Sequence, residues 1–126
     1  MSKVALVTGG SRGIGFGIAK ALAKEGFNLA INGVREESQA IKALEQLRSF
    51  GVRVEYVQGN IALKEDREGI LAGLRRKFGK IDVLVNNAGV APRTRCDVFE
   101  ISEEDYDVLM DINQKGTFFL TQEIAK

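Results

Sequence analysis

The sequence of 126 residues contains no histidine, and this absence excludes several kinds of active site. A Ser-His-Asp triad uses an imidazole as its base, and a His-Glu-x-x-His zinc site uses two imidazoles as ligands. The single cysteine, Cys96, cannot form a disulfide within the chain or a Cys-x-x-Cys motif. Because no activating motif accompanies Cys96, we interpret it as a loop residue outside the functional site. We expect no metal site and a reducing, cytoplasmic location.

Charge balance and hydropathy exclude two further classes of partner. Lysine and arginine number 18, and aspartate and glutamate number 17, so the net charge of +1 argues against a nucleic-acid partner. We expect no membrane partner, because no apolar run approaches the roughly 20 residues that cross a bilayer. The residues that follow Met1 also lack a signal-peptide pattern. A content of 44% hydrophobic and 28% charged residues is typical of a soluble globular domain.

Short apolar segments alternate with amphipathic segments along the chain, which predicts repeated β-α units and a mainly parallel sheet. The expected strands cover residues 4–7, 29–31, 52–56 and 81–85. The first of them has no polar interruption, as expected for a strand that is covered on both faces. The third alternates apolar and charged residues, and we therefore place it near an edge of the sheet.

Apolar residues at helical spacing predict helices after these strands, each with one face turned to the sheet. The expected inward residues are Ile14, Ile18 and Leu22 in the first helix, Ala40, Ile41, Leu44 and Leu47 in the second, and Ile70, Leu71, Leu74 and Phe78 in the third. A fourth helix is expected to begin near Ser102, in a capping-box-like segment, and to continue toward Ile124.

Glycine is enriched, and five of the 14 glycines lie between Gly9 and Gly17. They follow the first strand, and the first helix begins within the same loop. A helix N-terminus that follows such a loop can bind a pyrophosphate, because glycine allows close approach and the free N–H groups attract an anion. A flexible loop without a ligand is the alternative. A nucleoside triphosphate P-loop is disfavoured, because no Gly-Lys-Ser/Thr closes the turn.

Three motifs together make the chain resemble the short-chain dehydrogenase/reductase family, in particular its 3-oxoacyl-acyl-carrier-protein reductase-like members. The segment Thr8–Gly15 is similar to the family's cofactor motif, Asn86–Gly89 to its second signature, and Asn113–Phe118 to its helix segment with a catalytic-site asparagine. The resemblance implies an α/β, Rossmann-type doubly wound parallel sheet with the strand order 3-2-1-4. Residues 1–126 would form the N-terminal part of a single dinucleotide-binding domain, with four β-α units.

The resemblance also implies roles for individual residues. The pyrophosphate and adenosine ribose would contact Gly9, Ser11, Arg12, Gly13, Ile14 and Gly15. The adenine would lie against Asn60 and Ile61, where the family usually has an aspartate in place of Asn60. The ribose and nicotinamide side would contact Asn87, Ala88 and Gly89, although Asn86-Asn87 alone could be an ordinary turn after a strand. Asn113 would hold a water of the proton relay, in a segment that locally disturbs its helix; a polar residue that faces solvent is the alternative.

The residues at the end of the second strand bear on the choice of cofactor. NAD is usually held there by a carboxylate that binds both ribose hydroxyls, but this chain has Gly33 at that position. Arg12 and Arg35 could instead pair with the 2′-phosphate of NADP. Glu36 and Glu37 could neutralise Arg35, and all three could form an ordinary solvated helix start. We favour NADP over NAD.

The chain lacks the family's Tyr-x-x-x-Lys motif, because neither of its tyrosines has a lysine four residues later: Tyr56 precedes Asn60 and Tyr106 precedes Met110. We therefore expect the N-terminal half of an NADP(H)-dependent reductase, with no turnover by this part alone. The substrate would be a small carbonyl or alcohol compound, such as a 3-oxoacyl thioester bound to an acyl carrier, and the whole protein a homodimer or homotetramer. The rival functions are a non-catalytic dinucleotide-binding or sensing protein, and a flavodoxin-like phosphate-binding module.

Overall fold

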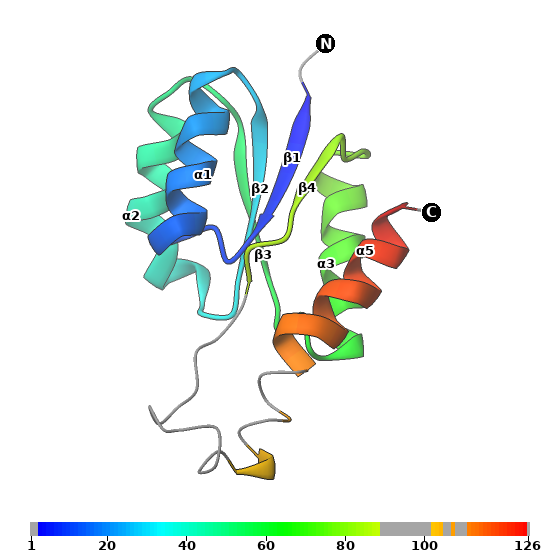
Figure 1. The fold of residues 1–126 in the computed structure, drawn as a ribbon. Helices are drawn as coiled ribbons and strands as arrows, with labels where there is room; N and C mark the ends of the chain where they lie inside the picture. Colours follow the sequence, from blue (N-terminus) through cyan, green and yellow to red (C-terminus); the bar gives the residue numbers. More distant parts are fainter. Residues whose placement is uncertain (1–2, 89–101, 105–106, 108–110, 126) are drawn as a thin grey trace.

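Four parallel strands form one sheet in the computed structural model of the protein (Figure 1). The structure describes residues 3–88, 102–104, 107 and 111–125. The strands are β1 (Val4–Thr8), β2 (Asn28–Gly33), β3 (Val54–Gln58) and β4 (Val83–Val85). Their spatial order is β3-β2-β1-β4, and Leu6 at the centre of β1 lies opposite Ala30 of β2 and Leu84 of β4. The predicted strand order and the doubly wound α/β architecture are confirmed.

Helices cover both faces of this sheet. They are α1 (Gly13–Lys24), α2 (Glu37–Arg48), α3 (Lys64–Lys77), the π-helix η1 (Asp111–Gly116) and α5 (Thr117–Ala125). The first two helices lie on one face, and α3 and α5 lie on the other (Figure 1). Within the described residues, no helix is long and apolar enough to cross a membrane.

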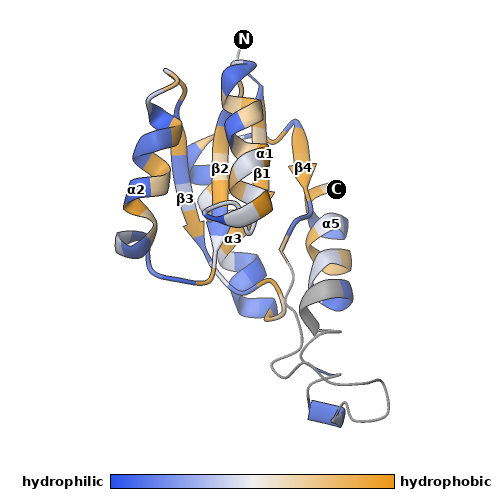
Figure 2. Cartoon of the chain, turned by 60° about the vertical axis from the view of Figure 1, so that its left-hand side comes forward, coloured by the Kyte–Doolittle hydropathy of each residue, from blue (hydrophilic) through white to orange (hydrophobic). Residues whose placement is uncertain are grey.

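The sheet separates two apolar clusters, because successive residues of a strand point to opposite faces. Val7 packs with residues of α1 and α2, whereas its neighbour Leu6 packs with residues of α3 and α5. All five residues of β1 are buried, and for residues 4–7 this was predicted from their uninterrupted apolar run. Figure 2 shows apolar residues along the strands and polar residues mainly on the helices.

The buried face of α1 differs from the predicted one. Ile14 is 79% exposed and Ile18 only partly buried, whereas the buried residues are Gly15, Ala19 and Ala23. These three small residues also recur every fourth position, so the stripe is one residue further along than predicted. Because small side chains let a helix backbone approach the sheet closely, the position of α1 depends on their size rather than on their hydrophobicity.

The buried face of α2 agrees with the prediction for three residues out of four. Ala40, Leu44 and Leu47 are buried, whereas Ile41 is 37% exposed. Ile41 lies one residue after Ala40, about 100° around the helix, and therefore at the margin of this face. In α3 the predicted Ile70 and Leu74 are buried, whereas Leu71 is only partly buried. The predicted Phe78 is also partly buried and lies at the C-cap, just past the end of the helix.

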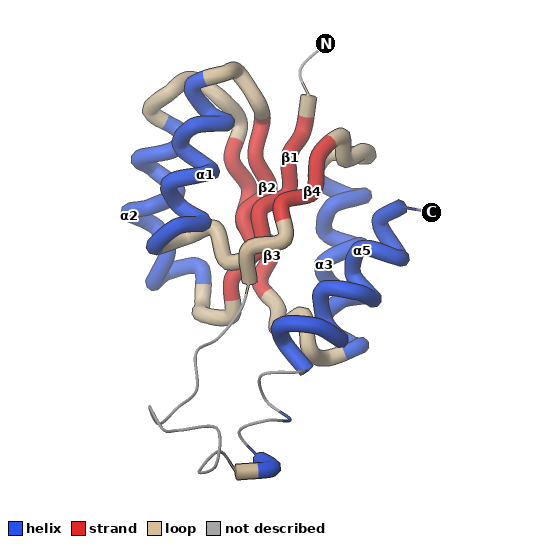
Figure 3. Tube along the Cα trace, in the orientation of Figure 1, coloured by secondary structure: helices blue, strands red, loops and turns tan. Residues whose placement is uncertain are grey.

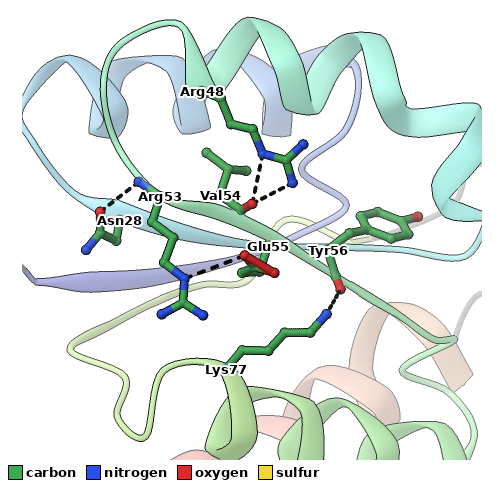
Figure 4. Close-up of polar contacts among 7 residues, drawn as sticks. All are labelled: Asn28, Arg48, Arg53, Val54, Glu55, Tyr56 and Lys77. Carbon is green, nitrogen blue, oxygen red and sulfur yellow. Dashed lines mark hydrogen bonds and ion pairs between the residues drawn. The ribbon is translucent and has the colours of Figure 1, made fainter.

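The strands β3 and β4 form the two edges of the sheet (Figure 3). The edge position predicted for the third strand is confirmed, but β3 begins at Val54, because pairing with β2 starts with Val54 opposite Leu29. Arg48 of α2 donates to the Val54 carbonyl oxygen from Nε at 3.1 Å and from Nη2 at 2.8 Å. Lys77 of α3 donates to the Tyr56 carbonyl oxygen at 2.9 Å (Figure 4). Side chains from both layers of helices therefore occupy acceptors on this edge.

Candidate functional site

The carboxyl ends of the four strands meet at one edge of the sheet, where the loops surround a cavity of about 460 Å³. Ligands of open α/β sheets bind at this edge. Eight of the predicted site residues line the cavity: Gly9, Ser11, Arg12, Arg35, Asn60, Ile61, Asn87 and Ala88. Asn32, Gly33, Val34 and Gly59 also line it and were not predicted to bind the cofactor. The predicted Gly89 lies outside the described residues.

Two glycines of the loop after β1 allow its backbone to pack tightly. Gly9 has a φ of +63°, a conformation that L side chains rarely adopt. A Cβ atom at Gly15 would lie 2.2 Å from the Gly9 carbonyl oxygen and 2.4 Å from Nδ2 of Asn87. The first turn of α1 can therefore approach the loop only because residue 15 has no side chain. The predicted Gly13, Ile14 and Gly15 do not line the cavity: Gly13 and Ile14 are exposed, and Gly15 is buried.

The N-terminus of α1 is open toward an anion. Arg12 occupies the N-cap position with extended backbone and forms no side-chain hydrogen bond to the first turn, which contains no acidic residue. The N–H groups of a first turn need partners, and together with the helix dipole they favour a negatively charged group. This end of α1 is therefore suited to a phosphate or pyrophosphate.

Thr8 connects the ends of β1 and β4. Its hydroxyl oxygen accepts hydrogen bonds from the backbone N–H groups of Asn87 at 3.0 Å and Ala88 at 2.9 Å, and it donates to the Val85 carbonyl oxygen at 3.3 Å. Asn87 also donates from Nδ2 to the Gly9 carbonyl oxygen at 3.2 Å. Thr8 is fully buried, so its role is to position Asn87 and Ala88 at the cavity. A hydroxyl residue at the end of an otherwise apolar strand is the sequence signal from which this positioning role could have been predicted.

Asn60 closes the turn after β3. Its side-chain oxygen accepts a hydrogen bond from the Ala62 N–H at 2.9 Å, and its own N–H donates to Oδ2 of Asp66 at 2.7 Å. The neighbouring Ile61 is 3% exposed. These contacts hold the turn against α3, and they use one of the two acceptor positions of the Asn60 amide oxygen.

Two residues, Asn32 near the end of β2 and Tyr56 at the centre of β3, form contacts that the sequence did not reveal. Asn32, which is 2% exposed, donates from Nδ2 to the carbonyl oxygens of Val57 and Gly59 at 2.9 and 3.1 Å. The Tyr56 hydroxyl donates to the Arg35 carbonyl oxygen at 2.7 Å. Burial raises the pKa of Tyr56, and the nearby Arg35 partly offsets this rise. The phenol is therefore a neutral donor near pH 7.

Arg35 lines the cavity, and its hydrogen-bonding capacity is only partly used. Its Nη2 donates to the Ser11 carbonyl oxygen at 3.2 Å, whereas its buried Nε has no partner among the described residues. Neither Glu36 nor Glu37, both described, forms an ion pair with Arg35. A buried N–H without a partner costs free energy, so the Arg35 side chain is not fully satisfied in this conformation. A phosphorylated dinucleotide fits this lining, because the α1 terminus is uncapped, Gly9 has no side chain and Arg35 contributes a cation.

The segment of Asn113 forms the π-helix η1, directly before α5. The resemblance implied a local disturbance of the helix here, and π-helical turns frequently occur at functional sites. The side chain of Asn113 lies outside the described part of the structure. Within the described residues, no group of three or more acidic or cysteine side chains could hold a metal ion.

Comparison with known proteins identifies relatives that share this architecture. The sequence model of the family described as short chain dehydrogenase matches residues 3–126. The 3-oxoacyl-acyl-carrier-protein reductase FabG of Staphylococcus epidermidis is 37% identical over 125 residues, which are 99% of this chain and 50% of that protein. The crystal structure of a 3-oxoacyl-acyl-carrier-protein reductase from Brucella melitensis in complex with NAD is 40% identical with a TM-score of 0.92, and the match covers 99% of this chain and 48% of that one.

A second solved structure carries the other nicotinamide cofactor. L-sorbose reductase from Gluconobacter frateurii, complexed with NADPH and L-sorbose, is 31% identical with a TM-score of 0.89. The match covers 98% of this chain and 46% of that one. The chain therefore spans about half the length of the curated relatives that it matches.

Proposed function

From the membership of this chain in the short-chain dehydrogenase family, we propose that it forms the cofactor-binding half of an NADP(H)-dependent oxidoreductase. The observation that carries the proposal is Arg35, a cation that lines the cavity at the carboxyl edge of the sheet and forms no ion pair with the described Glu36 or Glu37. A guanidinium in this place suits a phosphate ester better than a neutral ribose. The absence of a carboxylate at Gly33 supports the same choice, because NAD binding usually uses one there.

In the proposed complex, the N–H groups of the first turn of α1 bind the pyrophosphate, and Arg12 and Arg35 bind the 2′-phosphate. Asn60 and Ile61 line the adenine side, and Thr8 holds Asn87 and Ala88 toward the nicotinamide side. The bound nicotinamide would supply the hydride for reduction of a carbonyl or accept it from the matching alcohol.

We assign the proton transfer to residues outside residues 1–126, because neither Tyr56 nor Tyr106 is followed by a lysine at the fourth position. Asn113 in η1 would contribute a position for one water of the relay. These 126 residues are expected to bind the cofactor without turnover. Oxidation of NADPH by this chain in the presence of a ketone would contradict that expectation.

We further propose a 3-oxoacyl thioester on an acyl carrier as the substrate, on the strength of the Staphylococcus and Brucella relatives. The whole protein would be a cytoplasmic homodimer or homotetramer. Phe118 and Phe119 of α5 support an assembly, because they are 62% and 38% exposed and their rings stack edge to face at 5.2 Å.

Fluorescence titration with NADPH and NADH tests the proposed cofactor. We expect tighter binding of NADPH, and we expect Arg35→Ala to weaken it about 10- to 100-fold, the range for hydrogen bonds to charged groups. NADH affinity should remain within about twofold, because NADH has no 2′-phosphate to lose its contact. Arg76→Ala, on the exposed surface of α3, is the matched control for the loss of one positive charge. Equal affinities of the unsubstituted protein for the two cofactors would contradict the NADP assignment.

A further inference from the structure

The end of β2 has no room for a side chain, because a residue of β3 fills the space. A Cβ atom at Gly33 would lie 2.5 Å from the hydroxyl oxygen of Tyr56 and 3.4 Å from its Cζ. Real Cβ contacts essentially never fall below 3.0 Å. Tyr56 is 3% exposed and lies opposite Ile31, two residues before Gly33. Its ring packs in the apolar cluster on the α1 and α2 face of the sheet, and its hydroxyl reaches Gly33 at the end of β2.

The same strand holds the backbone that follows Gly33. The Gly59 N–H donates to the Gly33 carbonyl oxygen at 2.9 Å, and Nε2 of Gln58 donates to the Val34 carbonyl oxygen at 3.2 Å. The Tyr56 hydroxyl donates to the Arg35 carbonyl oxygen at 2.7 Å. Three consecutive carbonyl groups are therefore bound by donors in β3 and directly after it, and the Tyr56 contact is the one on Arg35 itself.

Arg35 depends on this anchoring for the orientation of its side chain. Its Nη2 is used by the Ser11 carbonyl oxygen, while its Nε remains buried and, among the described residues, unpartnered beside the cavity. A held backbone fixes the point from which the Arg35 side chain extends to the cavity, so loss of that restraint would let the guanidinium shift. The Tyr56 hydroxyl supplies that restraint at the carbonyl group of the same residue.

We propose that Tyr56 of β3 determines the cofactor preference of this protein, although it does not itself line the cavity. Its hydroxyl excludes every side chain at position 33, including the carboxylate that would bind the ribose of NAD. The same hydroxyl holds the backbone of Arg35, whose side chain lines the cavity. Tyr56 is a positioning residue, and this inference rests on the proposed binding of NADP(H).

The first test is the ratio of the dissociation constants for NADH and NADPH in Tyr56→Phe. This variant keeps the ring and removes the hydroxyl that binds the Arg35 carbonyl oxygen. We expect the ratio to fall about fivefold, the size of one neutral hydrogen bond, through weaker NADPH binding alone. A merely structural role would weaken both cofactors equally, because they differ only at the 2′-phosphate. An unchanged ratio would therefore overturn the positioning role.

The second test concerns the space at position 33 and does not need the cofactor. We expect Gly33→Ala to lower the melting temperature when Tyr56 is present, and Tyr56→Phe to rescue it, because the nearest atom is then Cζ at an ordinary contact distance. The double variant Gly33→Asp with Tyr56→Ala should prefer NADH, reversing the ratio. If Gly33→Asp alone folds normally and prefers NADH, the exclusion argument is overturned.

The unsubstituted protein separates failure of this inference from failure of the proposed function. If it binds neither cofactor, or binds both equally, the NADP proposal fails before any substitution is made, and the role of Tyr56 fails with it. If it prefers NADPH and Tyr56→Phe keeps the full preference, only the inference about Tyr56 is overturned.

Discussion

The close approach of α1 to the glycine loop makes Gly15 the position where one methyl group should matter most. A helical Gly→Ala substitution normally stabilises a protein by about 0.5–1 kcal/mol, because alanine has less conformational freedom to lose. Gly17, two residues later in the same helix, is exposed, and a Cβ atom added there would have no neighbouring atom within 4 Å. We therefore expect Gly17→Ala to stabilise the protein by this amount.

At Gly15 the expected sign is the opposite. A new Cβ would lie 2.2 Å from the Gly9 carbonyl oxygen, whereas an ordinary contact begins at 3.4 Å, so helix and loop must separate by about 1 Å. The loop has little freedom to move, because the Gly10 N–H donates to the Asn32 carbonyl oxygen at 3.1 Å and Asn87 binds the Gly9 oxygen. Overpacking of this kind costs about 1–3 kcal/mol. After the gain in helix propensity, we expect a net loss of about 1–2 kcal/mol.

Urea denaturation of Gly15→Ala, Gly17→Ala and the unsubstituted protein measures this difference. The two variants should differ by about 2–3 kcal/mol in the free energy of unfolding, or about 10 °C in melting temperature for a chain of this length. Both variants add one methyl group to α1, so they differ only in the atoms that surround the new Cβ. If Gly15→Ala is as stable as Gly17→Ala, the close packing of α1 against the glycine loop is refuted.

Two further substitutions test contacts that hold the strand ends. Thr8→Val removes the acceptor of two backbone N–H groups, so we expect it to destabilise the protein by about 1–3 kcal/mol in urea denaturation, whereas equal stability would contradict the anchoring of Asn87 and Ala88. The pKa of Asp82 lies below its usual value, because its carboxylate accepts the Val4 N–H at 2.8 Å and pairs with Lys80 at 3.2 Å. The stability that this supplies is present above the pKa of the unfolded chain and is lost as the pH falls through the folded-state pKa. Asp82→Asn should therefore flatten the acid side of a stability profile measured from about pH 6 to about pH 3, and an unchanged slope would contradict the assignment.

The parts of the fold that could be predicted are those set by patterns within one segment. The uninterrupted run of β1 predicted burial on both faces, and the alternation around Tyr56 predicted an edge strand. Both follow from the period of a strand, which depends on neighbours in the sequence. Likewise, the sequence predicted which motif residues lie at the cavity, because each of them belongs to a loop that follows a strand.

The predictions failed, or could not be made, for contacts that depend on how closely two elements pack. Ile14 is predicted inside and is exposed, because α1 approaches the sheet through Gly15 and Ala19 and leaves no space for a larger residue. The alternation of β3 predicts only the burial of Tyr56, since its contact with Gly33 joins positions 23 residues apart on neighbouring strands. Such a contact depends on strand register, and no local pattern encodes the pairing of a large residue on β3 with the lack of one on β2.

The cations on the β3 edge have a consequence for association between molecules. An unpaired edge strand is a template on which a strand of another chain can form hydrogen bonds. On β3, Arg48 and Lys77 reach the outward carbonyl groups of Val54 and Tyr56 from opposite faces of the sheet. A foreign strand would have to displace both charged groups before it gained its first bonds there. These two side chains therefore disfavour polymerisation through the β3 edge of the sheet.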